Sequence, residues 1–345
     1  MIASQLYRNS LETLIGSVET DAKSFLITGA SGLIGSCLAD VLLSANSSGK
    51  HNRVYLLGRS EEKLMNLFAT YFDSNSFHII EQDICEPLND SYDFDYIIHC
   101  ASNADPRLYV NYPVETMATN LKGGINVLEY VRKHKKCKAE ILSTFEVYGD
   151  TGKDKYSECE TGILDFNKIR SCYPESKRAL ELLARCYWQE YGSSVNIARL
   201  CSIYGPTMLE DDSKAHAQFL RNAVDGRDVI LKSPGTTNRS YCYVMDAVSA
   251  IFCVLFHGEV PEVYNISNEN STATIAQVAY SVAKLAGMSI VNDWVDAVQD
   301  DKIYKPHNCI LENDKLKSLG WSGRYNLEQG LSECLSILQE VKIGQ

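Results

Sequence analysis

Apolar runs of strand length alternate with longer amphipathic stretches through the first two hundred residues of the chain. Strands that are apolar on both faces and alternate with helices are typical of a parallel sheet covered on both sides. The pattern predicts strands at 25–28, 54–57, 77–80, 96–99, 139–143 and 195–200, with helices at about 33–43, 61–71, 113–134 and 174–191.

The pattern differs before the first strand. Residues 1–23 lack the basic start and long apolar stretch of a signal peptide. Apolar side chains recur there at near-helical spacing, at Leu6, Leu11, Leu14, Ile15 and Val18. We therefore expect an N-terminal helical extension packed on the body of the protein.

The alternation also weakens after the last predicted strand. Two polar stretches that contain Gly and Pro, at 205–216 and 232–240, predict loops between short helices and strands. We expect an α/β fold in which 24–203 form a Rossmann-type, doubly wound parallel sheet that binds NAD(P). Residues 204–345 would form mostly a smaller, interleaved substrate-binding region, with elements that return to the main sheet.

Composition narrows the class of function. The net charge of the 345 residues is -11, which disfavours a nucleic-acid binder. No apolar run is long enough to span a bilayer, so we expect a cytoplasmic, soluble protein. The 12 cysteines include no C-x-x-C pair and several lie in apolar runs, which is typical of buried thiols in a reducing compartment. We expect no metal site.

A glycine-rich turn joins the first predicted strand to the first helix. Its glycines, Gly29, Gly32 and Gly35, allow a tight turn, close approach of a pyrophosphate and close packing of helix on strand. The free N–H groups of the helix N-terminus would then bind the phosphates. This predicts a dinucleotide site that also includes Ser31, Leu33 and Ile34.

The end of the second predicted strand bears on the choice of cofactor. NAD-binding proteins usually have Asp or Glu there, whereas this chain has Gly58 and Arg59. A guanidinium can pair with a 2′-phosphate, which favours NADP over NAD. Arg59 stacked on adenine or lying in solvent is the alternative. Asp83, after the third strand, is placed either to meet the adenine or to form a turn.

Tyr173 and Lys177 have Y-x-x-x-K spacing at the start of a predicted helix, so both side chains share one face. A phenol is a poor base at neutral pH. A neighbouring ammonium together with the positive ring of an oxidised nicotinamide would stabilise the phenolate. Thr144, after the fifth strand, is placed to contact the same substrate oxygen. These residues predict a redox centre.

The motifs TGASGLIG, ASNADP, NLKGG, STFEVYGD, YPESK, ARLCSIYGP and NRSYCYVMD resemble the extended short-chain dehydrogenases/reductases, in the nucleotide-sugar epimerase/dehydratase group, from about residue 24 to about 320. The resemblance implies a bound NAD(P), a catalytic triad of Thr144, Tyr173 and Lys177, and a nucleotide-diphosphate sugar held partly by Arg239. It also implies further cofactor contacts at Ile84, Ala101, Ser102 and Asn120, and substrate contacts at Phe145 and Ser202.

Relatives of this group commonly dimerise through two helices, which here would be 113–134 and 174–191. An apolar stripe on the first of these helices fits either a homodimer or burial against the sheet: Val114, Met117, Leu121, Ile125 and Leu128.

Glu146 directs attention to chemistry at C5 of the sugar. Family members oxidise a C4 hydroxyl to a ketone, which acidifies the C5 proton, and a carboxylate beside Thr144 could remove that proton. Strand alternation predicts that Thr144 and Glu146 point the same way. We expect an epimerase or dehydratase that works through a 4-keto intermediate.

Two departures leave alternatives open. Dehydratases have Asp where this chain has Phe145. UDP-glucuronate decarboxylases have Ser there, and they have an Arg before Lys305-Pro306, where this chain has Tyr304. Arg and Tyr are not equivalent for orienting a carboxylate. A decarboxylase, a reductase that consumes NADPH, and a non-catalytic dinucleotide-binding regulator are the alternatives.

Overall fold

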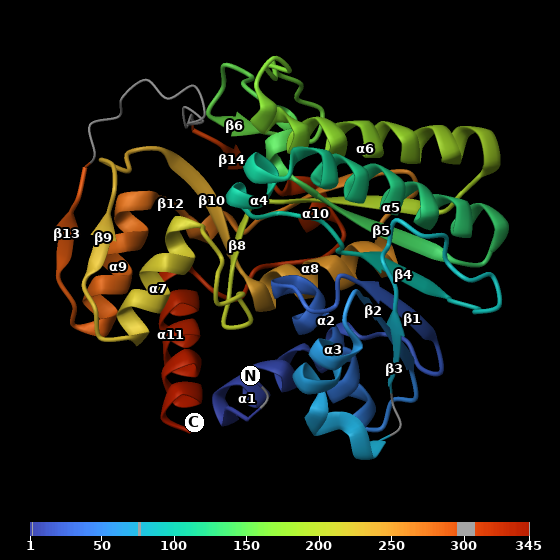
Figure 1. Ribbon diagram of the computed structural model, residues 1–345, viewed down its shortest axis with the longest axis horizontal. Helices are drawn as coiled ribbons and strands as arrows, with labels where there is room; N and C mark the ends of the chain where they lie inside the picture. Colours follow the sequence, from blue (N-terminus) through green and yellow to red (C-terminus); the bar gives the residue numbers. More distant parts are fainter. Residues whose placement is uncertain (2, 75–76, 295–307, 345) are drawn as a thin grey trace.

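The computed structural model describes residue 1 and residues 3–74, 77–294 and 308–344 (Figure 1). Within these ranges the centre is a seven-stranded sheet with the strand order β11-β7-β5-β4-β1-β2-β3. All neighbouring strands in it are parallel. The strands are β1 (Ser24–Thr28), β2 (Arg53–Gly58), β3 (Phe77–Glu81), β4 (Tyr96–His99), β5 (Lys138–Thr144), β7 (Val195–Leu200) and β11 (Val263–Ile266). The order reverses at β1, which confirms the doubly wound, Rossmann-type sheet.

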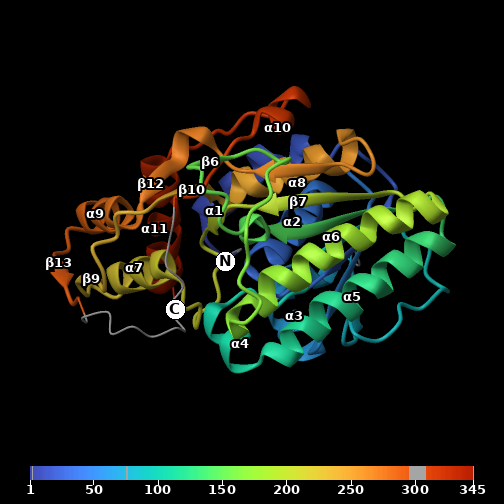
Figure 2. The ribbon, with the colours of Figure 1, turned by 90° about the horizontal axis from the view of Figure 1, so that it is seen from above.

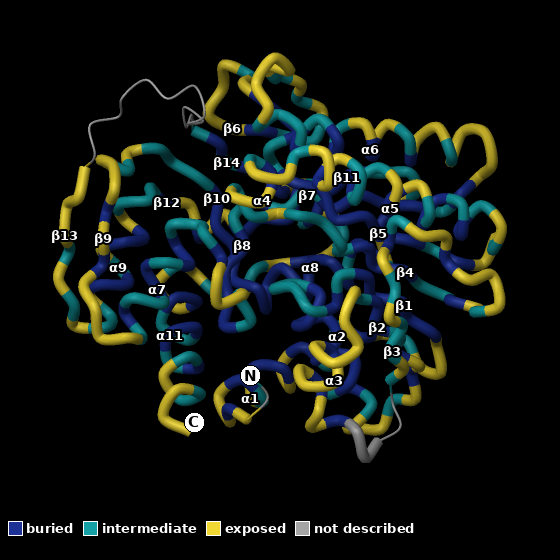
Figure 3. The backbone as a smooth tube through the Cα atoms, in the orientation of Figure 1, coloured by how far each residue is buried: buried dark blue, intermediate teal, exposed yellow. Residues whose placement is uncertain are grey.

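Helices cover both faces of this sheet (Figure 2). One cluster of buried apolar residues joins the sheet to α1 (Gln5–Leu14), α2 (Leu33–Ser47) and α8 (Val244–His257). A second cluster joins the other face to α5 (Pro113–Lys133) and α6 (Cys172–Tyr191). The central strands are buried between the two layers (Figure 3), which explains their apolar sequences.

The smaller region lies beside the sheet and is visible at the left of Figure 1. Its strands pair as β12-β10-β8, β13-β9 and β14-β6. They are β6 (Lys155–Tyr156), β8 (Ser202–Tyr204), β9 (Val229–Leu231), β10 (Asn238–Tyr243), β12 (Thr272–Thr274), β13 (Ile290–Asn292) and β14 (Ile310–Leu311). The remaining helices are α3 (Glu61–Leu67), α4 (Pro106–Asn111), α7 (Ala215–Val224), α9 (Ile275–Ala286), α10 (Asp314–Ser318) and α11 (Leu327–Ile343). No helix in the described ranges is long and apolar enough to cross a membrane.

The smaller region and the sheet share chain segments. After β8 the chain forms α7, β9 and β10 and then returns through α8 to β11, which pairs with β7 at the edge of the main sheet. This is the interleaving that the sequence predicts. Because the chain crosses between the two parts, residues from both can meet at the edge of the sheet.

The N-terminal residues form α1 and a short 3-10 turn, η1 (Ile15–Ser17). Leu11, Leu14 and Val18 are buried as expected, but Leu6 is 42% exposed. Tyr7 takes its place, because its spacing of four residues from Leu11 keeps it on the buried face. The Tyr7 hydroxyl donates a 2.8 Å hydrogen bond to buried Asp40 on α2, which ties α1 to the body of the protein.

Three predicted elements differ from the structure. The helix expected at 61–71 ends at Leu67 and continues as a 3-10 segment, η2 (Ala69–Ser74), in which Tyr71 turns into the core. The loops expected at 205–216 and 232–240 end earlier, because α7 begins at Ala215 and β10 at Asn238. Residues 215–216 belong to α7 and residues 238–240 to β10. The Gly and Pro residues of the two stretches do not show where the loops end.

Candidate active site

A cavity of about 510 Å³ opens at the carboxyl ends of β1, β4, β5 and β7. Residues of β8 and β10 line its other side, so it lies between the sheet and the smaller region. Ligands of doubly wound sheets bind at this edge, where the strand order reverses. The predicted site residues that line it are Gly29, Gly32, Leu33, Ile34, Gly35, Ser102, Thr144, Phe145, Glu146, Tyr173, Lys177, Ser202 and Arg239.

The glycine turn forms the floor of the cavity between β1 and α2. Gly29 has φ +65, and a Cβ there would lie 2.8 Å from the Ala101 backbone. A Cβ on Gly35 would lie 2.4 Å from the Gly29 carbonyl oxygen, so α2 packs against the turn as the spacing predicts. No side chain caps the N-terminus of α2. Its backbone N–H groups and its dipole therefore fit a pyrophosphate, and the residues fit a dinucleotide.

Tyr173 and Lys177 lie in the first turns of α6, and both side chains are buried. Lys177 Nζ donates a 2.8 Å hydrogen bond to the carbonyl of Leu142, which fixes the ammonium beside the end of β5. Burial lowers the pKa of Lys177 to about 8. The buried ammonium is thus anchored by backbone in the same cavity as the phenol.

The electrostatics of Tyr173 involve more groups than the Y-x-x-x-K spacing suggests. Burial raises the pKa of the phenol above its usual value, and the nearby charge of Glu146 raises it further. A hydrogen bond with the Thr144 hydroxyl and the charge of Arg170 lower that pKa. Within the protein, burial outweighs these two effects. The net effect of the chain's own groups is therefore to raise this pKa. Lys177 is not among the described groups that lower it, so the protein alone does not show the lowering that the Y-x-x-x-K spacing predicts.

Glu146 reaches the cavity by a route different from the one predicted. β5 ends at Thr144, and the next residues form a 3-10 turn, η3 (Phe145–Tyr148), so strand alternation does not apply to Glu146. The Thr144 side chain accepts a 3.3 Å hydrogen bond from the Glu146 N–H instead. Both residues still line the cavity. The prediction that they lie together is correct, but its reason is wrong.

Arg170 holds the Glu146 carboxylate, and the sequence did not single it out. Arg170 lies in a 3-10 turn, η4 (Ile169–Ser171), directly before α6. Its Nη1 lies 2.9 Å from Glu146 Oε2, and its Nη2 donates to Oε1 at 3.2 Å. The two side chains are 19% and 13% exposed, so the pair is shielded from water. An isolated Arg in an irregular stretch has no periodic signal that could identify it.

Arg239 and Phe145 form the opposite wall. Arg239 is on β10, and its guanidinium carbon lies 5.9 Å from the centre of the Phe145 ring. Its Nε is buried and has no hydrogen-bond partner among the described residues. Ser202 lines the same cavity at the start of β8. An unpaired guanidinium nitrogen at a cavity wall fits the predicted contact with a diphosphate.

Several predicted cofactor residues do not line the cavity. Arg59 is exposed and pairs with Glu115 at 3.3 Å. Asp83 accepts a 2.8 Å hydrogen bond from the Cys85 N–H, which is the predicted turn role, and its contact with adenine stays a prediction. The others outside the lining are Ser31, Ile84, Ala101 and Asn120.

Asn120 has a supporting position. It is fully buried on α5 and accepts a 2.7 Å hydrogen bond from Ser102, which does line the cavity. Its amide nitrogen donates to Ser176 on α6 at 2.9 Å. The residue thus joins α5, α6 and the loop after β4 beneath the cavity. Its assignment as a cofactor contact remains a prediction.

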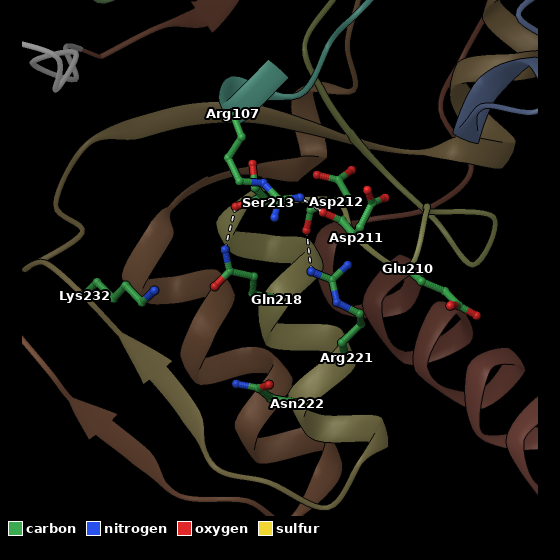
Figure 4. A pocket seen from close by; sticks show the side chains of 9 residues that line it. All are labelled: Arg107, Glu210, Asp211, Asp212, Ser213, Gln218, Arg221, Asn222 and Lys232. Carbon is green, nitrogen blue, oxygen red and sulfur yellow. Dashed lines mark hydrogen bonds between the residues drawn. The ribbon is translucent and has the colours of Figure 1, made fainter. Parts of the chain in front are cut away.

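A second hollow, of about 470 Å³, adjoins the mouth of the cavity (Figure 4). Contacts between α4 and the loop before α7 separate the two: Asp105 accepts from the Ser213 N–H at 2.7 Å, and Arg107 donates to the Asp211 carbonyl. In Figure 4 Arg221 reaches Asp212 of that loop, to whose carbonyl it donates a hydrogen bond, and Lys232 lies apart from both. The mouth is therefore built from segments more than a hundred residues apart in the chain.

Two predictions concern metals and the C-terminal stretch. In the part of the chain that the structure describes, no three His, Cys, Asp or Glu side chains gather as a metal site would require. Tyr304, Lys305 and Pro306, where decarboxylases differ from this chain, lie outside the described residues.

Comparisons with known proteins show the family and the fold of the chain. The NAD dependent epimerase/dehydratase family matches residues 25–267. UDP-glucuronic acid decarboxylase 3 of Arabidopsis thaliana is 34% identical over 314 residues, which cover 89% of this chain and 86% of that protein. A UDP-glucuronic acid 4-epimerase from Bacillus cereus, solved with UDP-glucuronic acid and NAD, has a TM-score of 0.78 at 22% identity, covering 92% of this chain and 99% of that one. A dTDP-glucose 4,6-dehydratase from Bacillus anthracis, solved with NAD, has a TM-score of 0.76 at 24% identity and covers 92% and 97%.

Proposed function

The chain belongs to the NAD-dependent epimerase/dehydratase family, and we propose that it oxidises the C4 hydroxyl of a nucleotide sugar and then carries out acid/base chemistry at C5. One observation carries this proposal. Tyr173, Lys177, Thr144 and Glu146 line the same cavity as the glycine turn. A proton acceptor for C4 and a carboxylate for C5 are therefore both beside the place where a nicotinamide cofactor fits.

The cofactor is held by the turn from Gly29 to Gly35 and by the start of α2. A nicotinamide held there would supply the acceptor for the C4 hydride and the donor for its return. Leu33 and Ile34 line the same cavity and cover the dinucleotide with apolar surface. Arg239, whose Nε has no hydrogen-bond partner among the described residues, binds the diphosphate of the sugar nucleotide.

Tyr173 removes the proton of the C4 hydroxyl. Thr144 donates or accepts a hydrogen bond at the same oxygen, since its hydroxyl is already paired with the phenol. Lys177 supplies a positive charge that is fixed by the Leu142 carbonyl and cannot swing away. The ketone that results at C4 acidifies the C5 proton, which makes C5 the next reactive centre.

Glu146 is the acid/base at C5. Its Oε2 is buried and pairs with the Arg170 cation, whose Nη1 lies 2.9 Å away, which leaves the second lone pair of this oxygen unused. A carboxylate oxygen with free lone pairs at a cavity wall can accept a proton from carbon and give it back. Return of that proton on the other face, or loss of a group from C6, would give the different products of the family.

Decarboxylation of a nucleotide hexuronate is the second candidate, and the curated relatives favour it. The chain matches UDP-glucuronic acid decarboxylases from Arabidopsis thaliana and Xenopus tropicalis at 30% identity or more. Loss of CO₂ from a 4-keto hexuronate leaves an enolate, and Glu146, once it has taken a proton from water, can deliver that proton to C5 in place of the CO₂. Phe145 stands where the dehydratases have an acid, so loss of water from C6 has the least support.

Turnover of a sugar-nucleotide panel, read by mass spectrometry and NMR, tests the proposal. Loss of about 44 mass units identifies decarboxylation, loss of about 18 identifies dehydration, and an unchanged mass with a new sugar identifies epimerisation. Tyr173→Phe should lower kcat at least about a hundredfold while cofactor binding persists. Full activity of that variant refutes the mechanism. Stoichiometric release of oxidised cofactor would identify a reductase, and binding without any turnover would identify a regulator.

We further propose that NADP is preferred over NAD. Arg59 lies at the carboxyl end of β2, and no carboxylate of that strand end competes for the ribose. Arg59 pairs with Glu115, whose side chain is half-exposed, so this ion pair can be exchanged for a 2′-phosphate at small cost.

We also propose a homodimer formed through α5 and α6. Of the predicted apolar stripe, Leu128 is buried, so packing on the sheet explains that residue. Val114, by contrast, is 81% exposed, and Met117 and Ile125 are also exposed. On α6, Leu182 is 64% exposed. Burial in a second copy explains these side chains better than the sheet does. Sedimentation at micromolar concentration tests it, and a monomer there refutes it.

A further inference from the structure

The acid/base residues share a neighbour that has no role in the function proposed so far. Arg170 contacts Glu146 through both of its terminal nitrogens, at 2.9 Å and 3.2 Å. Its Nη2 also donates to the hydroxyl of Tyr109 at 3.3 Å. A charged pair that is held by two nitrogens and shielded from water fixes the direction of the carboxylate more firmly than a surface ion pair would.

Tyr109 connects Arg170 to the catalytic phenol. It is on α4 and is 1% exposed. Its ring stacks on that of Tyr173 with 5.0 Å between ring centres and 14° between planes. The guanidinium carbon of Arg170 lies 5.3 Å from the centre of the Tyr109 ring. The Arg170 guanidinium therefore packs on the Tyr109 ring, which packs on the Tyr173 ring. A displacement of Arg170 would change the position of Tyr173 through Tyr109.

The charges of these groups act in opposite directions on Tyr173. The negative charge of Glu146 raises the pKa of the Tyr173 phenol, and the positive charge of Arg170 lowers it. Without Arg170, the carboxylate needed at C5 would oppose ionisation of the phenol needed at C4. With Arg170 between them, both groups can work in one cavity.

We propose that Arg170 is the positioning residue of the acid/base centre, holding Glu146 directly and Tyr173 through Tyr109. This rests on the roles proposed above for those two residues. Arg170 itself moves no proton. It couples the two half-reactions, because one guanidinium fixes the group that acts at C4 and the group that acts at C5.

The coupling makes a prediction that separates the two half-reactions. Oxidation at C4 is followed by cofactor absorbance at 340 nm in a single turnover, and acid/base chemistry at C5 by deuterium incorporation from D₂O into recovered sugar nucleotide. Arg170→Gln should slow both by about a hundredfold, as expected for a misplacement of about 1 Å, with KM changed less than about threefold. Tyr109→Leu should slow mainly the first step, and Glu146→Gln mainly the second.

Matched variants control for charge and for folding. Arg185 lies on the exposed side of α6, so Arg185→Gln removes the same charge away from the cavity and should leave both steps unchanged. Arg170→Lys keeps the charge but loses the two-nitrogen contact, and it should recover part of the rate, to within about tenfold of the unchanged protein. Tyr109→Phe, which keeps the ring, serves if Arg170→Gln fails to fold, and it should cost less than Tyr109→Leu.

A measurement without substrate separates this inference from the proposed function. In protein labelled with ¹³C at the tyrosine Cζ, the Tyr173 resonance is assigned by its loss in Tyr173→Phe. It should move in Arg170→Gln and Arg170→Lys and stay in Arg185→Gln. An unmoved resonance overturns the inference, and so does an Arg170→Gln variant that raises KM with kcat intact, since that would make Arg170 a substrate-binding residue. An unchanged protein that turns over no sugar nucleotide overturns the proposed function instead, while the resonance still decides the role of Arg170.

Discussion

The glycine turn and the acid/base cluster face the same cavity but are built in opposite ways. The turn consists of seven consecutive residues, Gly29 to Gly35, and its function depends on backbone shape. The cluster of Tyr109, Glu146, Arg170 and Tyr173 comes from α4, η3, η4 and α6, and its function depends on side chains that meet only after folding. Local backbone geometry can be read from a motif, whereas a side-chain cluster depends on the whole fold.

Glu146→Gln is expected to have the largest effect, and it isolates one member of the cluster. Deuterium incorporation at C5 should fall about a thousandfold, because the amide cannot act as a base. The C4 step should survive and reach its half-maximal rate at lower pH, since loss of the carboxylate charge lets Tyr173 ionise more readily. Glu175→Gln on α6 is the control. Retention of C5 exchange would remove Glu146 from the mechanism.

Gly29→Ala tests the backbone side of the comparison. The residue has φ +65, and its new methyl would lie 2.8 Å from the Ala101 backbone. We expect the Kd for the cofactor to rise about a hundredfold, or about 2.7 kcal/mol. Gly192 has φ +66 but nothing within 4 Å of a Cβ, so Gly192→Ala should lose only about 1 kcal/mol of stability and no cofactor affinity. The Kd for the cofactor is measured by isothermal titration calorimetry. If Gly29→Ala and Gly192→Ala change this Kd equally, the close approach of Gly29 to the Ala101 backbone does not matter for cofactor binding.

Asp40→Asn tests whether α2, the helix that follows the glycine turn, also depends on contacts between distant parts of the chain, as the acid/base cluster does. Burial raises the pKa of Asp40 to about 7, well above its unfolded value. The folded state therefore binds the proton more tightly, and its stability falls as the pH rises from about 4 to about 7. Asn can still accept the hydrogen bond from Tyr7.

The free energy of unfolding is measured in urea at each pH. Relative to the unchanged protein, Asp40→Asn should gain about 2 kcal/mol of this free energy as the pH rises from 5 to 8. Tyr7→Phe, which removes the hydroxyl but leaves the Asp40 carboxyl, should show no such gain in unfolding free energy as the pH rises. A constant difference between Asp40→Asn and the unchanged protein at all pH values would show that Asp40 titrates normally.

Arg59→Ala is expected to have the smallest effect. It should weaken NADP binding about three- to tenfold and change NAD binding less, because only NADP offers a 2′-phosphate to pair with the guanidinium. Glu115→Gln, which frees Arg59 from its ion pair, should act in the opposite direction. Equal loss for both cofactors in Arg59→Ala would place Arg59 on the adenine and would contradict the NADP preference.

The sequence predicted the main sheet, and most of the site residues that it singled out line the cavity. Runs of apolar residues located the strands of the main sheet up to β7 to within one residue at most ends, because buried parallel strands must be apolar on both faces. Tyr173, Lys177 and Thr144 were identified by spacing around a helix and a strand end. The 3-10 turn at Glu146 and the early end of α3 were missed, since both follow from packing and neither changes the hydrophobic pattern.

By itself the sequence determined the strands of the main sheet up to β7, the glycine turn and the Y-x-x-x-K pair, because each depends on neighbours within a few positions along the chain. Only the tertiary structure decided that Arg170 pairs with Glu146, that Tyr109 stacks on Tyr173, and that Arg59 lies outside the cavity beside Glu115. The physical reason is the distance along the chain over which each kind of interaction acts. Backbone conformation and periodicity are local, whereas ion pairs and ring stacking act between any groups that the fold brings within a few ångströms.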